Sequence, residues 1–335
     1  MKLMKRTIIS CLIGSCFMIP VEAQTSKSEL LSHLELASGN YCDYPNPTGH
    51  VTPAPAGYEP FYVSHYGRHG ARYMTDDDAY KYVLGKMDTA QVRGWLTEKG
   101  KEVYERLKVA AADAYHRDGD LTRLGGRQHR AIAHRLCVNY PSLMMQPITV
   151  KANSSTVRRC MLSMANFCQE LVIMNPSLTI SMDASEHDMY YLIPNDSIEI
   201  PKSETDGELY DKLDKFRHEK LNGRHQIELL FNDTKAASEF IDGYQFADAL
   251  WNITSNMLCL PELGLSFNDL FTEDELIDGF RVYNASWCLW EGMLVLLLTR
   301  SVVWRPSFPL GTRTTVSSVT SVLTSVLTLL SVRSF

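Results

Sequence analysis

The chain has 335 residues, of which 45% are hydrophobic and 21% are charged. This composition is typical of a globular protein and excludes a disordered, collagen-like or coiled-coil chain. At about 100 to 200 residues per domain, the length allows one large domain or two modest ones. Lys and Arg number 33 against 39 Asp and Glu, a formal net charge of −6. Without a global basic field, we expect no nucleic-acid partner and no attraction to an anionic membrane.

Residues 1–23 have the order of a secretory signal peptide. Lys2, Lys5 and Arg6 precede an uncharged run from Thr7 to Val21, and a small residue, Ala23, ends the segment. Because this order stands at the extreme N-terminus, we expect cleavage after residue 23 and a secreted or periplasmic protein. The uncharged run is shorter than the about 20 residues that span a bilayer core, so no transmembrane anchor is expected. The alternative is a buried N-terminal helix.

Cleavage would leave six of the eight cysteines, because Cys11 and Cys16 lie in the signal segment. Cys16 follows a poor lipoprotein box, so we expect no lipid anchor there; lipidation at Cys16 is the alternative. The remaining six permit disulfides in an oxidising compartment, but they are too few for a disulfide scaffold and too scattered for a zinc site. We expect buried thiols with one or two bridges.

The elements expected in the mature chain alternate between strand and helix. Five prolines over residues 43–60 predict an extended lead-in. Aromatic and β-branched residues predict a first strand over Phe61–Tyr66 that ends at Gly67. Thr97 and Thr122 stand where an N-cap side chain would begin a helix. The further expected elements are helices over 78–86, 97–116 and 122–136, a strand over 147–152, and helices over 163–171, 202–220 and 236–257.

This order predicts an α/β fold, in which a core mixed sheet flanked by helices carries an inserted smaller α-helical domain. We expect the first part of the core over 24–184, the helical insert over 185–280 and a return to the core over 281–335. The last part is interpreted as incomplete or aberrant after about residue 291. In open sheets ligands bind beyond the carboxyl ends of the strands, so the site is expected after the first strand.

A cationic segment, Arg68-His69-Gly70-Ala71-Arg72, stands at that strand end. Guanidinium groups bind phosphate oxygens bidentately and stay charged at any working pH, and the glycine lets backbone approach a ligand. A histidine ring nitrogen can attack phosphorus and leave again, which divides one difficult displacement into two easier ones. The segment therefore predicts a phosphate site with His69 as nucleophile. The alternative is a solvated basic cluster.

A further arginine is expected near the end of the second strand. Arg159 follows a polar stretch and opens a predicted helix, so it can project towards the opening that holds His69. The alternative is an ordinary first-turn arginine. Its neighbour Arg158 points elsewhere on any regular backbone and is interpreted as a surface charge.

Three segments together resemble the histidine acid phosphatases, and within them the bacterial multiple inositol polyphosphate phosphatase group. They are residues 68–73 (Arg-His-Gly-Ala-Arg-Tyr), residues 121–125 (Leu-Thr-Arg-Leu-Gly) before a helix, and residues 155–167. The resemblance runs from about Tyr58 to Trp290. It implies a core α/β domain with an inserted α-domain, and hydrolysis of small phosphomonoesters such as phytate through a phosphohistidine. It also implies that His69 is the nucleophile and that Arg68, Arg72 and Arg159 bind the phosphate. Because these arginines offset the phosphate charge and the ten histidines show no metal-ligand spacing, we expect no metal or other cofactor.

The proton donor is the part of the pattern that is hardest to place. The family supplies it from a His-Asp or His-Ala-Glu motif near the C-terminus, to protonate the leaving alkoxide. Here the His-Asp pair is His187-Asp188, which makes Asp188 the candidate; otherwise residues 185–191 are structural. If the chain has no donor, the alternative function is a non-catalytic anion-binding protein. A mutase is the third possibility, which the signal segment disfavours.

The expected place of that motif has an unusual composition. No Asp, Glu or Lys follows Glu291, and residues 315–335 are built almost wholly from Ser, Thr, Val and Leu. We interpret this as a replaced C-terminal portion, for instance by a frameshift near Gly292. The alternative is a genuine strand-rich or membrane-associated tail. The sequence carries no signal for an oligomeric state.

Overall fold

The computed structural model describes residues 27–44, 47, 54–192, 204–301 and 325–328, so the predicted signal peptide lies outside it. The elements in chain order are α2 (Lys27–Ser32), η1 (Leu34–Tyr41), β1 (His65–Arg68), α3 (Asp78–Val92), α4 (Glu98–Ala114), α5 (Arg123–Asn139), α6 (Pro141–Met144), β2 (Thr149–Asn153), α7 (Arg158–Met174), β3 (Thr179–Asp183), η2 (Glu186–Asp188), α8 (Met189–Leu192), α9 (Glu204–Lys220), α10 (Arg224–Leu230), α11 (Thr234–Phe240), α12 (Gly243–Asn256), η3 (Met257–Cys259), η4 (Pro261–Leu263), η5 (Asn268–Leu270), α13 (Glu273–Ser301) and β4 (Ser325–Thr328).

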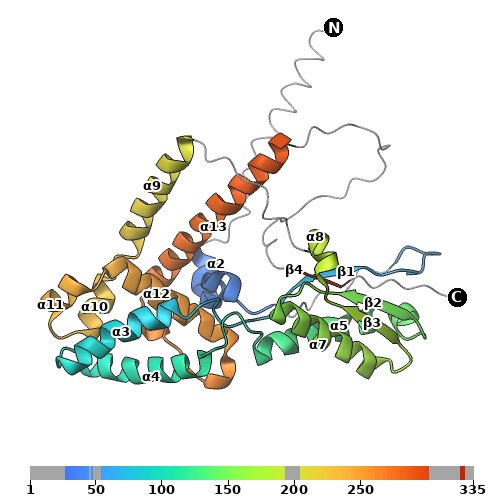
Figure 1. Cartoon of the computed structure of the whole chain (residues 1–335), viewed down its shortest axis with the longest axis horizontal. Helices are drawn as coiled ribbons and strands as arrows, with labels where there is room; N and C mark the ends of the chain where they lie inside the picture. The colour runs from blue at the N-terminus through green and yellow to red at the C-terminus, as the bar shows by residue number, and fades with distance from the viewer. Residues whose placement is uncertain (1–26, 45–46, 48–53, 193–203, 302–324, 329–335) are drawn as a thin grey trace, which may run out of the picture.

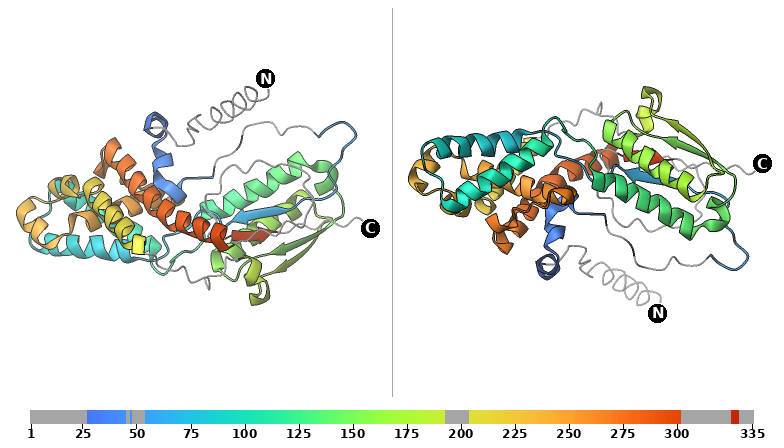
Figure 2. Two further views of the ribbon diagram at one scale, coloured as in Figure 1. Left: turned by 90° about the horizontal axis from the view of Figure 1, so that it is seen from above. Right: turned by 90° about the horizontal axis from the view of Figure 1, so that it is seen from below.

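These elements form two parts that lie side by side (Figures 1 and 2). The α/β part contains the four strands with α5 and α7, and the helical part contains α3, α4 and α9 to α13. The predicted fold class, α/β with a helical portion, is confirmed. The helical part also takes in two helices from early in the chain, because α3 packs against α12 and α4 packs against α10. The domain boundaries at residues 184 and 280 stay predictions.

The strands pair in both senses. β2 and β3 are parallel, with Asn153 opposite Asp183, and α7 forms the connection between them. β1 is antiparallel to β4, with Arg68 opposite Ser325. β4 belongs to the tail of biased composition that follows Glu291, so part of this tail pairs with the strand that leads to His69. The origin of the tail stays a prediction.

Both predicted helix caps are present. The Thr97 side chain accepts a hydrogen bond from the Gly100 N–H at 2.9 Å, and the Thr122 side chain accepts one from the Gly125 N–H at 3.2 Å. Each threonine thereby satisfies a backbone donor that the first helical turn leaves unpaired. The local signal therefore predicted where α4 and α5 begin.

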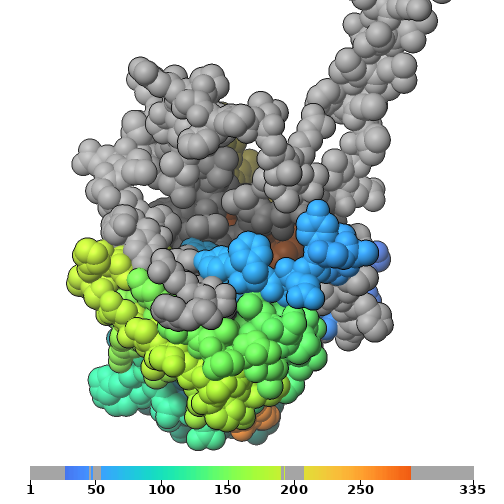
Figure 3. Space-filling view, turned by 90° about the vertical axis from the view of Figure 1, so that its right-hand side faces the viewer, coloured from blue at the N-terminus to red at the C-terminus, as the bar shows by residue number. Residues whose placement is uncertain are grey.

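The first strand begins later than predicted. Regular strand geometry starts at His65 and includes Gly67 and Arg68, whereas Phe61 is 86% exposed and forms no strand. Figure 3 shows the chain before β1 in blue, lying across the surface of the α/β part. Aromatic composition alone was misleading, because a strand also needs a partner and a face to bury.

The helix predicted over 236–257 is two helices. Asp242 separates α11 from α12, and its side chain accepts a hydrogen bond from the Gln245 N–H at 2.9 Å. An aspartate in extended backbone, followed by Gly243, begins a new helix more favourably than it continues an old one.

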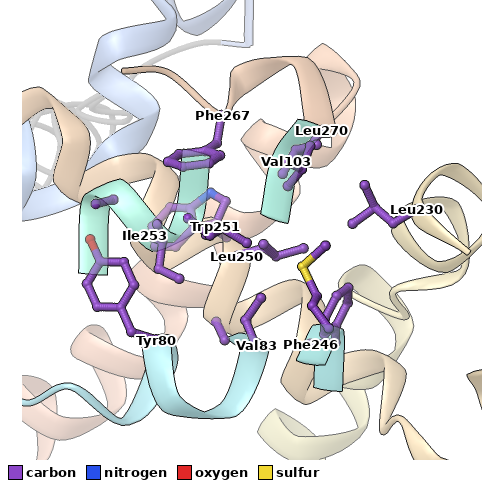
Figure 4. Close-up of a cluster of buried hydrophobic side chains, with 14 of the residues drawn as sticks. Tyr80, Val83, Val103, Leu230, Phe246, Leu250, Trp251, Ile253, Phe267 and Leu270 are labelled. Atoms are coloured by element: carbon purple, nitrogen blue, oxygen red, sulfur yellow. The ribbon is translucent and has the colours of Figure 1, made fainter. Parts of the chain in front are cut away.

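A hydrophobic core holds the helical part together (Figure 4). Val83, Val103 and Leu250 are fully buried where α3, α4 and α12 meet, and Trp251 lies among them. The Trp251 indole N–H donates to the Leu276 carbonyl at 3.3 Å. A side chain at Gly279 would come within 2.2 Å of that indole nitrogen, so the glycine makes room for the tryptophan.

Two further expectations concern disulfides and the membrane. Cys42, Cys137, Cys160, Cys168 and Cys259 are free thiols, so the expected bridges are not found among these five. Cys137 and Cys259 lie in different core clusters, and Cys160 and Cys168 share a third cluster without forming a bond. Within the described ranges, no helix is both long and apolar enough to cross a bilayer.

Candidate functional site

The turn after β1 is held by two helices of the α/β part. His69 follows directly after the strand and is 8% exposed. The Gly70 N–H donates to Ser163 Oγ of α7 at 3.1 Å, and the Ala71 N–H donates to Gln128 Oε1 of α5 at 2.7 Å. These bonds fix the backbone immediately after His69.

Close contact between glycines joins this turn to the start of α5. A side chain at Gly70 would come within 2.4 Å of the Gly125 carbonyl oxygen, and one at Gly125 within 2.3 Å of the Ala71 carbonyl oxygen. The Thr122 N–H also donates to the Ala71 carbonyl at 2.9 Å. Only residues without Cβ allow two backbones to pack this closely. The contact therefore requires a glycine in each of the two segments, at Gly70 and at Gly125.

The His69 ring has a defined tautomer. Its Nδ1 lies 2.8 Å from the Gly70 carbonyl oxygen, and because a carbonyl only accepts, Nδ1 carries the proton. Nε2 is then the free base, and it is buried without a hydrogen-bond partner among the described residues. Burial lowers the pKa of His69 to about 3, and the nearby charges of Arg68, Arg159 and Arg72 lower it as well, while the Gly70 bond opposes the shift. The ring is therefore neutral across the ordinary pH range.

Three guanidinium groups lie near enough to this ring for their charges to lower its pKa. Burial lowers the pKa of Arg68, and the charges of Arg72 and Arg159 add to the effect, so the three lie close enough to repel one another. Nε of Arg68 and Nε of Arg159 are buried and make no hydrogen bond within the described ranges. No acid of the described residues forms an ion pair with any of the three. A concentration of positive charge that the protein leaves uncompensated favours a bound anion.

Arg72 and Arg159 contact residues outside the strands, namely Tyr41, Tyr73 and Gly119. The Arg72 guanidinium lies 5.5 Å from the centre of the Tyr41 ring, and its Nη1 donates to the Tyr73 carbonyl at 2.9 Å. Arg159 Nη1 reaches the Gly119 carbonyl oxygen at 3.5 Å. Gly119 has a φ of 64°, which favours glycine, and a side chain there would come within 3.0 Å of the same guanidinium.

The two remaining residues considered from sequence, Arg158 and Asp188, contact other partners than the three guanidinium groups. Arg158 is exposed and pairs with Asp120 at 3.2 Å, as expected for a surface charge. Asp188 ends η2, and its carboxylate accepts a hydrogen bond from the Asn153 side chain. Asn153 is the last residue of β2, so Asp188 lies at the carboxyl end of that strand, which is also the strand that leads towards Arg159.

The sequence reasoning missed a second buried histidine. His129 of α5 is 3% exposed, and its Nε2 donates to the Arg68 carbonyl at 3.1 Å. Burial lowers its pKa to about 4, and the nearby His65 lowers it further, against the effect of the Arg68 bond. The helical period carried the signal, because His129 lies four residues after Gly125, on the face that contacts the turn.

Fold and site together describe an α/β protein with a helical part, whose arginines surround a neutral histidine at a strand end. Solved structures with a similar fold include those of the multiple inositol polyphosphate phosphatase of Bifidobacterium longum. Its apo form matches with a TM-score of 0.50 and 16% identity, over 77% of this chain and 72% of that chain. Its inositol hexasulfate complex matches with a TM-score of 0.49 and 16% identity, over 77% of this chain and 74% of that chain. Its phosphate complex matches with a TM-score of 0.47 and 15% identity, over 77% of this chain and 72% of that chain.

Comparisons of sequence alone add nothing to this. No protein-family model and no curated protein sequence matches the chain. At the identities given above, the likeness to the apo form shows the fold.

Proposed function

We propose that this protein is a phosphomonoester hydrolase of the histidine acid phosphatase type, acting through a phosphohistidine on inositol polyphosphates such as phytate. The observation that carries the proposal is the His69 ring, whose Nε2 is buried, unprotonated and without a partner in the described chain. A nucleophile must present a lone pair, and a site built for a dianion must supply positive charge. Arg68, Arg72 and Arg159 supply that charge.

The reaction follows from these groups in two steps. His69 Nε2 forms a bond to phosphorus while the bond from phosphorus to the ester oxygen breaks, and the leaving alkoxide takes a proton from an acid. Water then attacks phosphorus and gives a proton to the conjugate base of that acid while the bond from phosphorus to Nε2 breaks, which releases phosphate and restores the free ring and the acid. The guanidinium groups stabilise the phosphoryl oxygens in both steps. No step requires a metal ion or an organic cofactor.

Asp188 is the proposed acid. Its support is its place at the carboxyl end of β2, held by the Asn153 side chain. A second candidate function, a non-catalytic anion-binding protein, is favoured by the absence of Asp, Glu and Lys after Glu291, where the family carries its donor. The two functions differ in turnover and not in phosphate binding.

The substrate class and the location belong to the same proposal. The resemblance of three segments and the fold shared with an inositol polyphosphate phosphatase support a phosphorylated cyclitol as substrate. The order of residues 1–23 supports a secreted or periplasmic protein, in which the chain meets its substrate outside the cytoplasm.

A turnover assay on phytate and on an aryl phosphate tests the proposal. His69→Ala should abolish release of phosphate from both. Asp188→Asn should slow phytate hydrolysis by about 10² to 10⁴, the usual contribution of a general acid. The rate of aryl phosphate hydrolysis should fall much less, since phenolate leaves without a proton. If the unaltered chain binds phosphate but turns over neither ester, the anion-binding function is correct; if Asp188→Asn leaves the phytate rate unchanged, Asp188 is not the acid.

A further inference from the structure

A second basic cavity lies between α5 and α7, separate from the guanidinium cluster around His69. Its volume is about 420 Å³, within the usual range for small-molecule sites. Arg123, Arg127 and Arg130 of α5 line it, together with Leu162 and Asn166 of α7. His69 and the three arginines of the cluster do not. The three lining arginines follow at intervals of four and three residues, so they share one face of the helix.

Arg130 is oriented without being neutralised. Its Nε donates to Asn166 Oδ1 at 3.0 Å, and one terminal nitrogen donates to Gln169 Oε1 at 3.0 Å. Asn166 is fixed in turn, because its Nδ2 donates to the Leu162 carbonyl at 2.8 Å. A side chain at Gly126 would come within 3.0 Å of the Asn166 amide oxygen. Two neutral amides thus hold the guanidinium in place and leave its full charge facing the cavity.

The charges around the cavity do not cancel. Arg127 forms an ion pair with Glu262 of η4. Arg123 is exposed and forms no ion pair with an acid of the described chain. An adjoining cavity of about 210 Å³ shares Arg123 and holds Asp113, but the Asp113 carboxylate forms an ion pair with Arg117 at 3.9 Å. Three guanidinium groups against one paired carboxylate leave two positive charges on this face, in a protein whose formal net charge is −6.

We propose that this cavity is a second anion site, which binds a small molecule carrying at least two phosphate groups. Arg123 and Arg130 are seven residues apart, about 10 Å along the helix, so each guanidinium can contact a different phosphate group of one ligand. A compact polyphosphorylated ring spans that distance and offers each guanidinium its own phosphate. The inference extends the proposed function in its ligand class, but binding at this cavity requires no hydrolysis at His69.

Calorimetric titration of the full chain with inositol hexasulfate, which has no phosphoester to hydrolyse, tests the proposal. The unaltered protein should take up a second molecule per chain. Arg123→Gln combined with Arg130→Gln should lose that second molecule, or bind it about tenfold or more weakly, as expected for the loss of charge-assisted contacts. The matched control is Arg93→Gln combined with Arg135→Gln, which removes the same charge from exposed or half-buried positions outside the cavity.

Uptake of only one molecule by the unaltered protein would overturn the proposal, and so would equal weakening in the control pair. If the double variant fails to fold, Asn166→Asp decides, because a carboxylate beside Arg130 should weaken the second event by a similar factor. Unchanged binding in Asn166→Asp would contradict the proposal. Phytate turnover is measured separately, because it reports on hydrolysis at His69 and not on binding at the second cavity. A protein that does not hydrolyse phytate but takes up the second molecule would contradict the proposed function and support the second anion site.

Discussion

At the scale of single residues, the chemistry of His69 depends on a hydrogen bond and on burial. The Gly70 carbonyl holds the proton on Nδ1, and burial disfavours a second proton on Nε2. The ring therefore stays a free nucleophile in acid, where an ordinary histidine with a pKa near 6.5 would be protonated. The His69 lone pair is therefore available at the low pH at which a carboxylic acid still carries a proton to donate.

Replacing Arg159 by alanine should weaken both substrate and phosphate binding. Its guanidinium contributes charge to the site, and loss of a charge-assisted contact costs about 1.5 to 3 kcal/mol, or about 10- to 150-fold in affinity. Arg158→Ala is the control, because that side chain is exposed and paired with Asp120. Phosphate titration of both variants gives the answer. Equal losses would mean that the assignment of these adjacent arginines is wrong.

His129 should make the folded state less stable in acid. Its pKa is about 4 when folded, against about 6.5 in an unfolded chain. Between these values the unfolded state binds a proton that the folded state does not, so the free energy of unfolding falls as the pH drops from about 6.5 to 4. His129→Gln keeps a donor towards the Arg68 carbonyl and cannot titrate. Urea unfolding should therefore depend less on pH in this variant; an unchanged slope would show that His129 does not contribute.

At the scale of elements, the contact between the turn after β1 and the start of α5 positions the nucleophile. Gly70→Ala and Gly125→Ala each place a methyl group against backbone, which should lower the free energy of unfolding by about 1 to 3 kcal/mol and reduce activity. Gly85→Ala in α3 is the control: nothing lies within 4 Å of its Cβ, and alanine favours helix by about 1 kcal/mol. Denaturant midpoints compare the three. Similar effects at all three glycines would contradict this account.

Local patterns predicted the beginnings of elements better than their partners. Thr97 and Thr122 marked two helix starts, because a cap acts within one turn. The true start of β1 depends on pairing with β4, which lies more than two hundred residues later. The site divides in the same way. Arg68, His69 and Arg72 were found from one short segment, whereas the contact of Gly119 with Arg159 joins distant segments that no spacing reveals.

At the scale of the whole molecule, the tail after Glu291 matters through β4. This strand pairs along the full length of β1, and without it β1 would present an unpaired edge. A chain ending at Ser301 should therefore aggregate more than the full chain, as measured by light scattering. Equal solubility would mean that the β4 pairing contributes little. DNA sequencing across codons 285 to 335 tests the separate prediction that this tail results from a frameshift.

The central claim is that His69 carries the phosphoryl group, and rapid quenching with labelled phytate or aryl phosphate tests it most directly. The unaltered protein should yield a covalent adduct that is labile in acid and stable in base, as expected of a phosphohistidine, and His69→Ala should yield none. Arg158→Ala should trap the same amount as the unaltered protein. Label trapped by His69→Ala, or an adduct on another residue, would contradict the account.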